Sequence, residues 1–181
     1  MKQGQRIKTL IDEAKLAGRV ETLAQEIAAA KPLDLLVVAI LKGSFMFAAD
    51  LIRGMHRSGL SPHVEFMHLS SYLAGTVSTG HVNILRDIDS SVAGRDVLLV
   101  DDILESGRTL AFAKDLIAAR GARRVLIAVM LEKPGKRAVQ IKADFVGFEC
   151  PDLFVVGYGM DVAHAYRELP YIGVVETAPA A

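Results

Sequence analysis

Two acidic side chains and a short polar loop follow a run of four aliphatic residues in the middle of the chain. The run is 97–100, and Asp101 and Asp102 come directly after it. Residues 105–109 add another carboxylate, two hydroxyls and a glycine before a helical apolar pattern begins. Open α/β sheets bind ligands at the carboxyl ends of their strands, and backbone N–H groups at a helix start bind phosphate. The segment therefore predicts a site for a ligand with hydroxyl groups and a phosphate, together with a divalent metal ion.

Strands and helices alternate around this segment. Continuous apolar runs, typical of strands covered on both faces, occupy 35–41, 97–100 and 125–131. Helical spacing of apolar residues predicts helices over 7–30, 45–52 and 109–120. Shorter apolar runs predict further strands over 64–69, 82–85, 145–148, 154–156 and 172–175.

This alternation predicts an α/β fold with a doubly wound, mostly parallel sheet flanked by helices. We expect the C-terminal tail, which lacks long helical patterns, to form a small hood over the sheet. The 181 residues form one domain in this interpretation, since the chain is too short for two ordinary ones. Its core covers about 30–132, and its hood covers about 133–175 together with the N-terminal helix.

Composition excludes several classes of protein. Hydrophobic residues make up 51% of the chain, which is typical of a globular protein. The net charge is zero, so no general attraction to nucleic acid or anionic membrane is expected. A single cysteine, Cys150, excludes a disulfide framework, and the five histidines lack paired metal-ligand spacing. With no signal peptide and no apolar run of membrane-spanning length, we expect a cytoplasmic protein with no membrane or nucleic-acid partner.

The acidic segment resembles the phosphoribosyl pyrophosphate (PRPP) signature of the type I phosphoribosyltransferases. Neither the P-loop pattern G-x-x-x-x-G-K-[ST] nor a G-x-G-x-x-G turn after a strand is present, so those nucleotide-binding classes are not favoured. The resemblance implies that Asp101 and Asp102 bind the ribose hydroxyls. It also implies that the 5′-phosphate is wrapped by Glu105, Ser106, Gly107, Arg108 and Thr109.

Two upstream segments resemble the hypoxanthine-guanine branch of this family. Lys42 and Gly43 lie in a segment that looks like the pyrophosphate-binding loop of that branch, in which the peptide before the lysine is cis. Ser71 and Tyr72, followed by small polar residues up to residue 80, resemble its mobile lid, whose closure would exclude water. An ordinary β–α turn and an exposed hairpin loop are the alternatives for these two segments.

The tail contains residues similar to the purine-binding segments of the same branch. The resemblance implies that Lys133 donates to the exocyclic oxygen at C6 of the purine and that Phe154 stacks on the ring. The backbone of Val155 would bond the edge of the base. For Phe154 alone, packing in the core is the alternative interpretation.

The resemblance also implies groups for a metal ion and for the leaving group. Asp161 would contact Mg²⁺ through water, and Asp101 and Asp102 would also be metal-binding residues. Arg167 would bind pyrophosphate as a charged fork.

Two acids depart from the pattern of the branch. The first acid of its signature is usually Glu, and here it is Asp101. The acid thought to take the purine proton is usually Asp, and here it is Glu105, our candidate catalytic base. Its side chain is longer by one methylene, and a general base must reach within about 2.6–3.2 Å of its proton, directly or through one water.

The resemblance implies transfer of 5-phosphoribose from PRPP to a 6-oxopurine, with Mg²⁺ as cofactor and a homodimer or homotetramer as the assembly. One alternative is an RNA-binding regulator of pyrimidine genes with uracil phosphoribosyltransferase activity, which the neutral charge disfavours. Another is a transferase that prefers xanthine or adenine. Lys133 disfavours adenine because adenine carries an amino donor at C6, where a lysine needs an acceptor.

Overall fold

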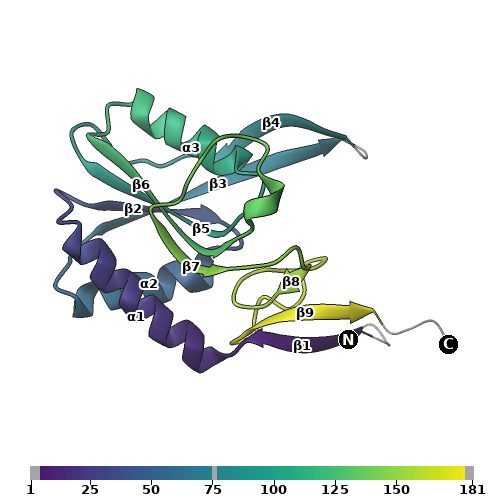
Figure 1. Ribbon diagram of the computed structural model, residues 1–181. Coiled ribbons are helices and arrows are strands. Elements are labelled where there is room, and N and C mark those ends of the chain that lie inside the picture. Colours follow the sequence, from purple (N-terminus) through teal and green to yellow (C-terminus); the bar gives the residue numbers. More distant parts are fainter. Residues whose placement is uncertain (1–4, 75–76, 178–181) are drawn as a thin grey trace.

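The computed structural model contains a six-stranded sheet with helices on both faces and a separate three-stranded sheet beside it (Figure 1). The structure describes residues 5–74 and 77–177, apart from the side chains of residues 5, 71–74, 77–81 and 177.

The large sheet has the strand order β4-β3-β2-β5-β6-β7. Its strands are β2 (Leu36–Leu41), β3 (His63–Ala74), β4 (Val77–Arg86), β5 (Asp96–Leu104), β6 (Arg124–Glu132) and β7 (Phe145–Glu149). Neighbouring strands pair in parallel, except that the edge strand β4 runs antiparallel to β3. The predicted doubly wound, mostly parallel sheet is confirmed.

Helices cover both faces of this sheet (Figure 1). α1 (Glu13–Ala29) and α2 (Phe45–Arg57) pack on one face, and α3 (Arg108–Ala119) packs on the other. Successive side chains of a strand point to opposite faces. Val37 of β2 accordingly lies in the apolar cluster with α1 and α2, whereas Leu36 and Val38 lie in the cluster with α3. Both faces of the central strands are buried, which explains their continuous apolar runs.

The first element differs from the prediction of a helix over 7–30. β1 (Gln5–Ile11) is a strand that pairs antiparallel with β9 (Ile172–Thr177), and α1 begins only at Glu13. The Asp12 carboxylate caps this helix by accepting from the Lys15 backbone N–H at 2.9 Å. The helix prediction was wrong at this end because the partner strand lies at the other end of the chain, where local periodicity carries no information.

The small sheet is the hood, and it has the order β1-β9-β8, with β8 at Val155–Val156. Two elements expected in the hood belong to the core instead, because α1 packs against α2 and β7 is an edge strand of the large sheet. From the N-terminal part of the chain, β1 joins the hood. This differs from the expected hood of about 133–175 with the N-terminal helix. The segment 157–171, between β8 and β9, faces the carboxyl ends of the central strands.

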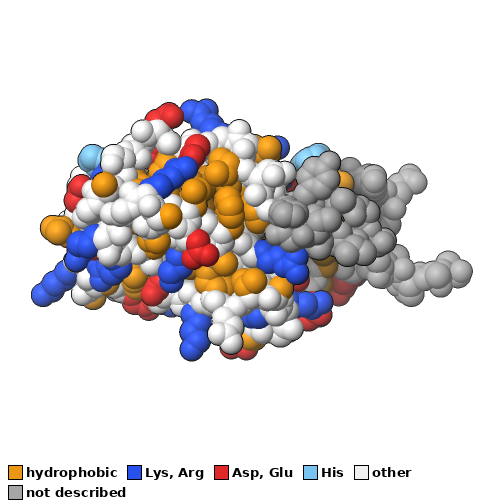
Figure 2. Space-filling model, turned by 90° about the horizontal axis from the view of Figure 1, so that it is seen from above, with side chains coloured by type: hydrophobic (Ala, Val, Ile, Leu, Met, Phe, Trp, Pro, Cys, Tyr) orange, Lys and Arg blue, Asp and Glu red, His pale blue; other side chains and the backbone are white. Residues whose placement is uncertain are grey.

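The surface has mixed charge on the face seen in Figure 2, where blue and red side chains are interspersed with apolar ones. None of the helices within the described residues is both long and apolar enough to cross a membrane.

Candidate active site

Three loops follow three adjacent parallel strands and lie together at one edge of the sheet. β2 ends before Lys42, β5 carries Asp101 and Asp102 near its end, and β6 ends before Lys133. The strands β2, β5 and β6 are neighbours in the sheet. The structure therefore brings together three segments that are about 30 to 60 residues apart in sequence, at the edge where open α/β sheets bind ligands.

The loop after β2 packs directly on the acidic pair. A Cβ atom built on Gly43 would lie 1.6 Å from the Oδ2 atom of Asp102, so only glycine leaves room for this carboxylate. On its other side, the carbonyl oxygen of Gly43 would lie 2.1 Å from a Cβ atom on Gly159. The peptide between Leu41 and Lys42 is cis, as the resemblance implied. The loop is thus confined between β5 and the hood.

The acidic pair carries negative charge in a partly enclosed site. The backbone N–H of Asp102 donates to the Asp101 carboxylate at 3.0 Å. Burial, with the neighbouring charge of Asp102, raises the pKa of Asp101 well above its ordinary range. Burial also raises the pKa of Asp102, although a hydrogen bond with Asp101 and the positive charge of Arg167 act in the opposite direction. Such a pair favours ligands that bring hydroxyl donors or a cation.

Arg167 and Asp161 form the hood side of the site. The Arg167 guanidinium binds the Asp161 carboxylate at 2.7 Å and donates to the Gly159 carbonyl at 2.6 Å. The other oxygen of Asp161 accepts from the backbone N–H of His164 at 2.7 Å. Arg167 is therefore held beside the Gly43 loop, where its positive charge acts to lower the pKa of Asp102.

Carboxylates are present here, but no preformed cage is found: within 5–74 and 77–177, no three His, Cys, Asp or Glu residues cluster as a metal site. Mg²⁺ often keeps several waters and is bound by one or two carboxylates together with substrate phosphates. The oxygen donors of Asp101, Asp102 and Asp161, and the uncompensated charge of the acidic pair, fit an ion bound in that way.

A pocket of about 470 Å³ lies beside the acidic pair, between β5, β6 and the hood. Glu105 and Lys133 line it, with 3.6 Å between the lysine Nζ and the glutamate Oε1. The Lys133 side chain is 8% exposed and that of Glu105 is 44% exposed. Phe154, which also lines the pocket, is 59% exposed, so the alternative that it packs in the core is wrong. The pocket therefore combines a carboxylate, an ammonium and an exposed aromatic side chain.

The loop from Ser106 leads into α3 with its backbone fixed. Gly107 has φ of +79°, and a Cβ atom there would lie 2.5 Å from Cγ2 of Ile141. The carbonyl of Ser106 accepts from the backbone N–H of Ala138 at 2.9 Å. Arg108 and Thr109 lie in the first turn of α3, and the positive end of the helix dipole there favours an anion.

Arg137, beside the site, was among the residues that sequence reasoning missed. The Arg137 guanidinium donates to the backbone carbonyls of Leu104 and Glu105. No local signal could have indicated this, because its acceptors are main-chain atoms of another strand end. The predicted lid residues Ser71 and Tyr72 have backbone in β3, but their side chains lie outside the described residues.

A larger hollow of about 660 Å³ lies on the other side of Tyr158, between α1 and α2. Both arginines that line it are paired with carboxylates, Arg57 with Glu21 and Arg53 with Asp50. The smaller pocket is lined by Asp102 of the acidic pair and by the Glu105 and Lys133 side chains, so we assign the candidate active site there.

Comparisons with known proteins match most of the chain to the phosphoribosyltransferases, the family that the sequence motifs resemble. Residues 7–163 match the profile of the phosphoribosyl transferase domain. The hypoxanthine-guanine phosphoribosyltransferase of Bacillus subtilis is 45% identical over 172 residues, which are 94% of each chain. The hypoxanthine phosphoribosyltransferase of Escherichia coli is 41% identical, over 93% of this chain and 95% of its own. A crystal structure of a hypoxanthine-guanine phosphoribosyltransferase from Bacillus anthracis superposes with a TM-score of 0.86 at 42% identity, covering 94% of this chain and 100% of that one.

Proposed function

The chain belongs to the phosphoribosyl transferase domain family, and from this premise we propose that it transfers the 5-phosphoribosyl group of PRPP to hypoxanthine or guanine. The products are IMP or GMP and pyrophosphate. The observation that carries the proposal is a pocket lined by Asp102, Glu105 and Lys133, with the Gly43 loop packed directly on Asp102.

The purine binds in the pocket between β5, β6 and the hood in this proposal. Lys133 donates to the oxygen at C6, and Glu105 accepts the proton from N7, the neighbouring position on the same edge of the base. The short separation of the two side chains supports this assignment. Phe154 stacks on the ring, and the Val155 backbone bonds the opposite edge.

PRPP binds along the strand ends. Asp101 and Asp102 accept hydrogen bonds from the ribose hydroxyls, and the 5′-phosphate lies at the start of α3 against residues 105–109. Lys42, the Gly43 backbone and Arg167 hold the pyrophosphate. The positive charge of Arg167 near Asp102 supports this placement.

The reaction breaks the bond between C1′ and the pyrophosphate oxygen and forms a bond between C1′ and N9 of the purine. Bond breaking leads, so the ribose develops oxocarbenium character while negative charge collects on the pyrophosphate. Lys42, Gly43 and Arg167 are placed to stabilise that charge. Glu105 takes the proton that the purine loses. If Ser71 and Tyr72 act as a lid, they exclude water at this stage.

Asp101, Asp102 and Asp161 are the residues that would hold Mg²⁺. When it is bound with PRPP, the ion supplies positive charge against the departing pyrophosphate. The raised pKa values of the acidic pair support a site that needs a cation.

We also propose that the protein is a homodimer or homotetramer. Val64 and Phe66, which share one face of β3, are 36% and 45% exposed, and we propose that a second copy packs there. Sedimentation velocity tests the assembly. The cytoplasmic location expected from the sequence stays a prediction.

Incubation of the purified chain with PRPP, Mg²⁺ and one base at a time tests the proposed function. We expect IMP from hypoxanthine and GMP from guanine, and no nucleotide when PRPP is omitted or excess EDTA is present. Preference for xanthine would support the alternative transferase. Preference for uracil, with salt-dependent binding of a structured RNA, would support the alternative regulator, which neither the relatives nor the mixed surface charge favours.

A further inference from the structure

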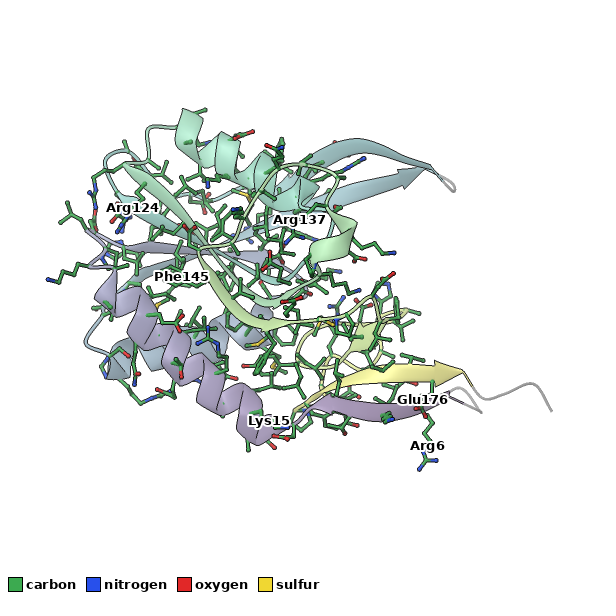
Figure 3. The ribbon with its side chains drawn as sticks, viewed as in Figure 1. Arg6, Lys15, Arg124, Arg137, Phe145 and Glu176 are labelled. Atoms are coloured by element: carbon green, nitrogen blue, oxygen red, sulfur yellow. The ribbon has the colours of Figure 1, made fainter. Side chains whose placement is uncertain are left out.

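Arg137 binds the backbone of both loops that carry the purine-facing side chains. Arg137 directly follows the short 3-10 helix Pro134–Lys136 (Figure 3). Its guanidinium donates to the carbonyl oxygens of Leu104 at 2.7 Å and Glu105 at 2.6 Å, and to that of Lys133 at 3.3 Å. It also forms an ion pair with the Glu132 carboxylate, and its side chain is 19% exposed. One side chain therefore connects the end of β5 to the end of β6.

These carbonyls lie where the backbone hydrogen bonding between β5 and β6 ends. Leu104 is paired with Glu132 at the end of the register, and the backbone N–H of Lys133 donates to the Leu104 carbonyl at 3.0 Å. One residue further, the Glu105 carbonyl accepts from Arg137. A guanidinium suits this position because it presents five donors in a rigid plane, whereas a lysine ammonium is a single centre.

We propose that Arg137 is a positioning residue that sets the separation of the Glu105 carboxylate and the Lys133 ammonium. The inference rests on the proposed function, in which these two groups bind neighbouring positions on one purine edge. Their side chains come from different loops, so the 3.6 Å between them depends on how those loops are held together. Without the guanidinium, the two loops keep the bond from the Lys133 backbone N–H to the Leu104 carbonyl, but the Glu105 carbonyl loses its donor. Glu105 is then free to shift relative to Lys133, and a misplacement of about 1 Å can cost about 100-fold in rate.

The phosphate-binding side of the same loop is held in another way. The Ser106 carbonyl accepts from the Ala138 backbone N–H, a bond that does not need the Arg137 side chain. Gly107 packs against Ile141. Loss of Arg137 is therefore expected to impair the purine step more than PRPP binding.

Arg19 offers a matched control on the other side of the sheet. It is 24% exposed, donates to the carbonyls of Gly147 at 3.0 Å and Val146 at 2.7 Å, and pairs with Glu26 at 2.6 Å. It thus replicates the chemistry of Arg137 between α1 and β7, without contact with the pocket residues. Removing either arginine should cost similar stability, but only Arg137 should affect the purine.

The test compares wild type, Arg137→Ala, Arg137→Lys and Arg19→Ala by melting temperature and by steady-state kinetics with hypoxanthine and PRPP. We expect kcat/KM for hypoxanthine to fall about 100-fold in Arg137→Ala and about 10-fold or more in Arg137→Lys. The KM for PRPP should change by less than about 3-fold, and Arg19→Ala should keep wild-type kinetics. Millimolar guanidinium ion should restore activity to Arg137→Ala but not change Arg19→Ala.

Kinetics of both Arg137 variants within about 3-fold of Arg19→Ala, or equal losses for purine and PRPP without rescue by guanidinium, would overturn the inference. If Arg137→Ala does not fold, Arg137→Lys decides alone, because wild-type kinetics in that variant would also overturn it. An inactive wild type would instead contradict the proposed function.

Discussion

Replacing Gly43 with alanine should remove most of the activity without unfolding the protein. The new Cβ atom would start 1.6 Å from Oδ2 of Asp102, and real Cβ atoms essentially never lie closer than 3.0 Å to another atom. The carboxylate must therefore move by about 1.4 Å. The loop cannot retreat instead, because Gly159 packs against the Gly43 carbonyl on the other side. A displacement of this size costs about 100-fold in kcat/KM, or about 2.7 kcal/mol of transition-state stabilisation.

The assay is steady-state formation of IMP from PRPP and hypoxanthine, with circular dichroism and the melting temperature as checks of folding. Gly18→Ala is the matched control, because nothing lies within 4 Å of a Cβ atom on this exposed glycine of α1. Alanine there should stabilise the helix by up to about 1 kcal/mol and leave the kinetics unchanged. A folded Gly43→Ala variant with kcat/KM within about 3-fold of wild type would refute the reasoning that the loop and Asp102 are in close contact at the reacting centre.

Three further predictions concern the ionisable groups. Lys133→Met removes a charged donor, so kcat/KM for hypoxanthine should fall about 10- to 100-fold; an unchanged value would contradict its role at O6. Glu105→Gln should lower kcat by about 100-fold or more while Glu105→Asp stays active, and pH–rate profiles of both variants check this; an unaffected Gln variant would remove Glu105 as the base. Because the pKa of Asp101 is raised in the folded state, its ionisation destabilises the fold above the pKa of an exposed aspartate, about 4. Asp101→Asn should therefore melt higher than wild type at pH 8, with a difference that shrinks as the pH falls toward about 4; equal melting temperatures at pH 8 would contradict the raised pKa.

The central sheet could be predicted because its strands carry their own signal. Both faces of β2, β5 and β6 are buried, so each strand is a continuous run of apolar residues. The polar and charged residues of the candidate site come where each run ends. The order of these strands in the sheet places Lys42, Asp101 and Lys133 at one edge. Local patterns and the geometry of parallel sheets therefore sufficed to predict the strands and the acidic segment, whereas Lys42 and Lys133 were assigned from the resemblance to the family.

Other features depend on contacts between distant residues and could not be predicted in that way. The spacing of Ile7, Leu10 and Ile11 fits a helix, but pairing with β9 makes this segment a strand. Arg137 binds backbone carbonyls, and no pattern of side chains in the sequence indicates such a contact. The pairing of Glu105 with Lys133 likewise depends on how two strand ends are joined.

The most direct test of the proposed activity is ³¹P NMR of the folded wild-type protein with PRPP, hypoxanthine and Mg²⁺. We expect the PRPP resonances to be replaced by those of IMP and pyrophosphate in equal amounts. Unchanged PRPP, or pyrophosphate formed without nucleotide, would contradict it.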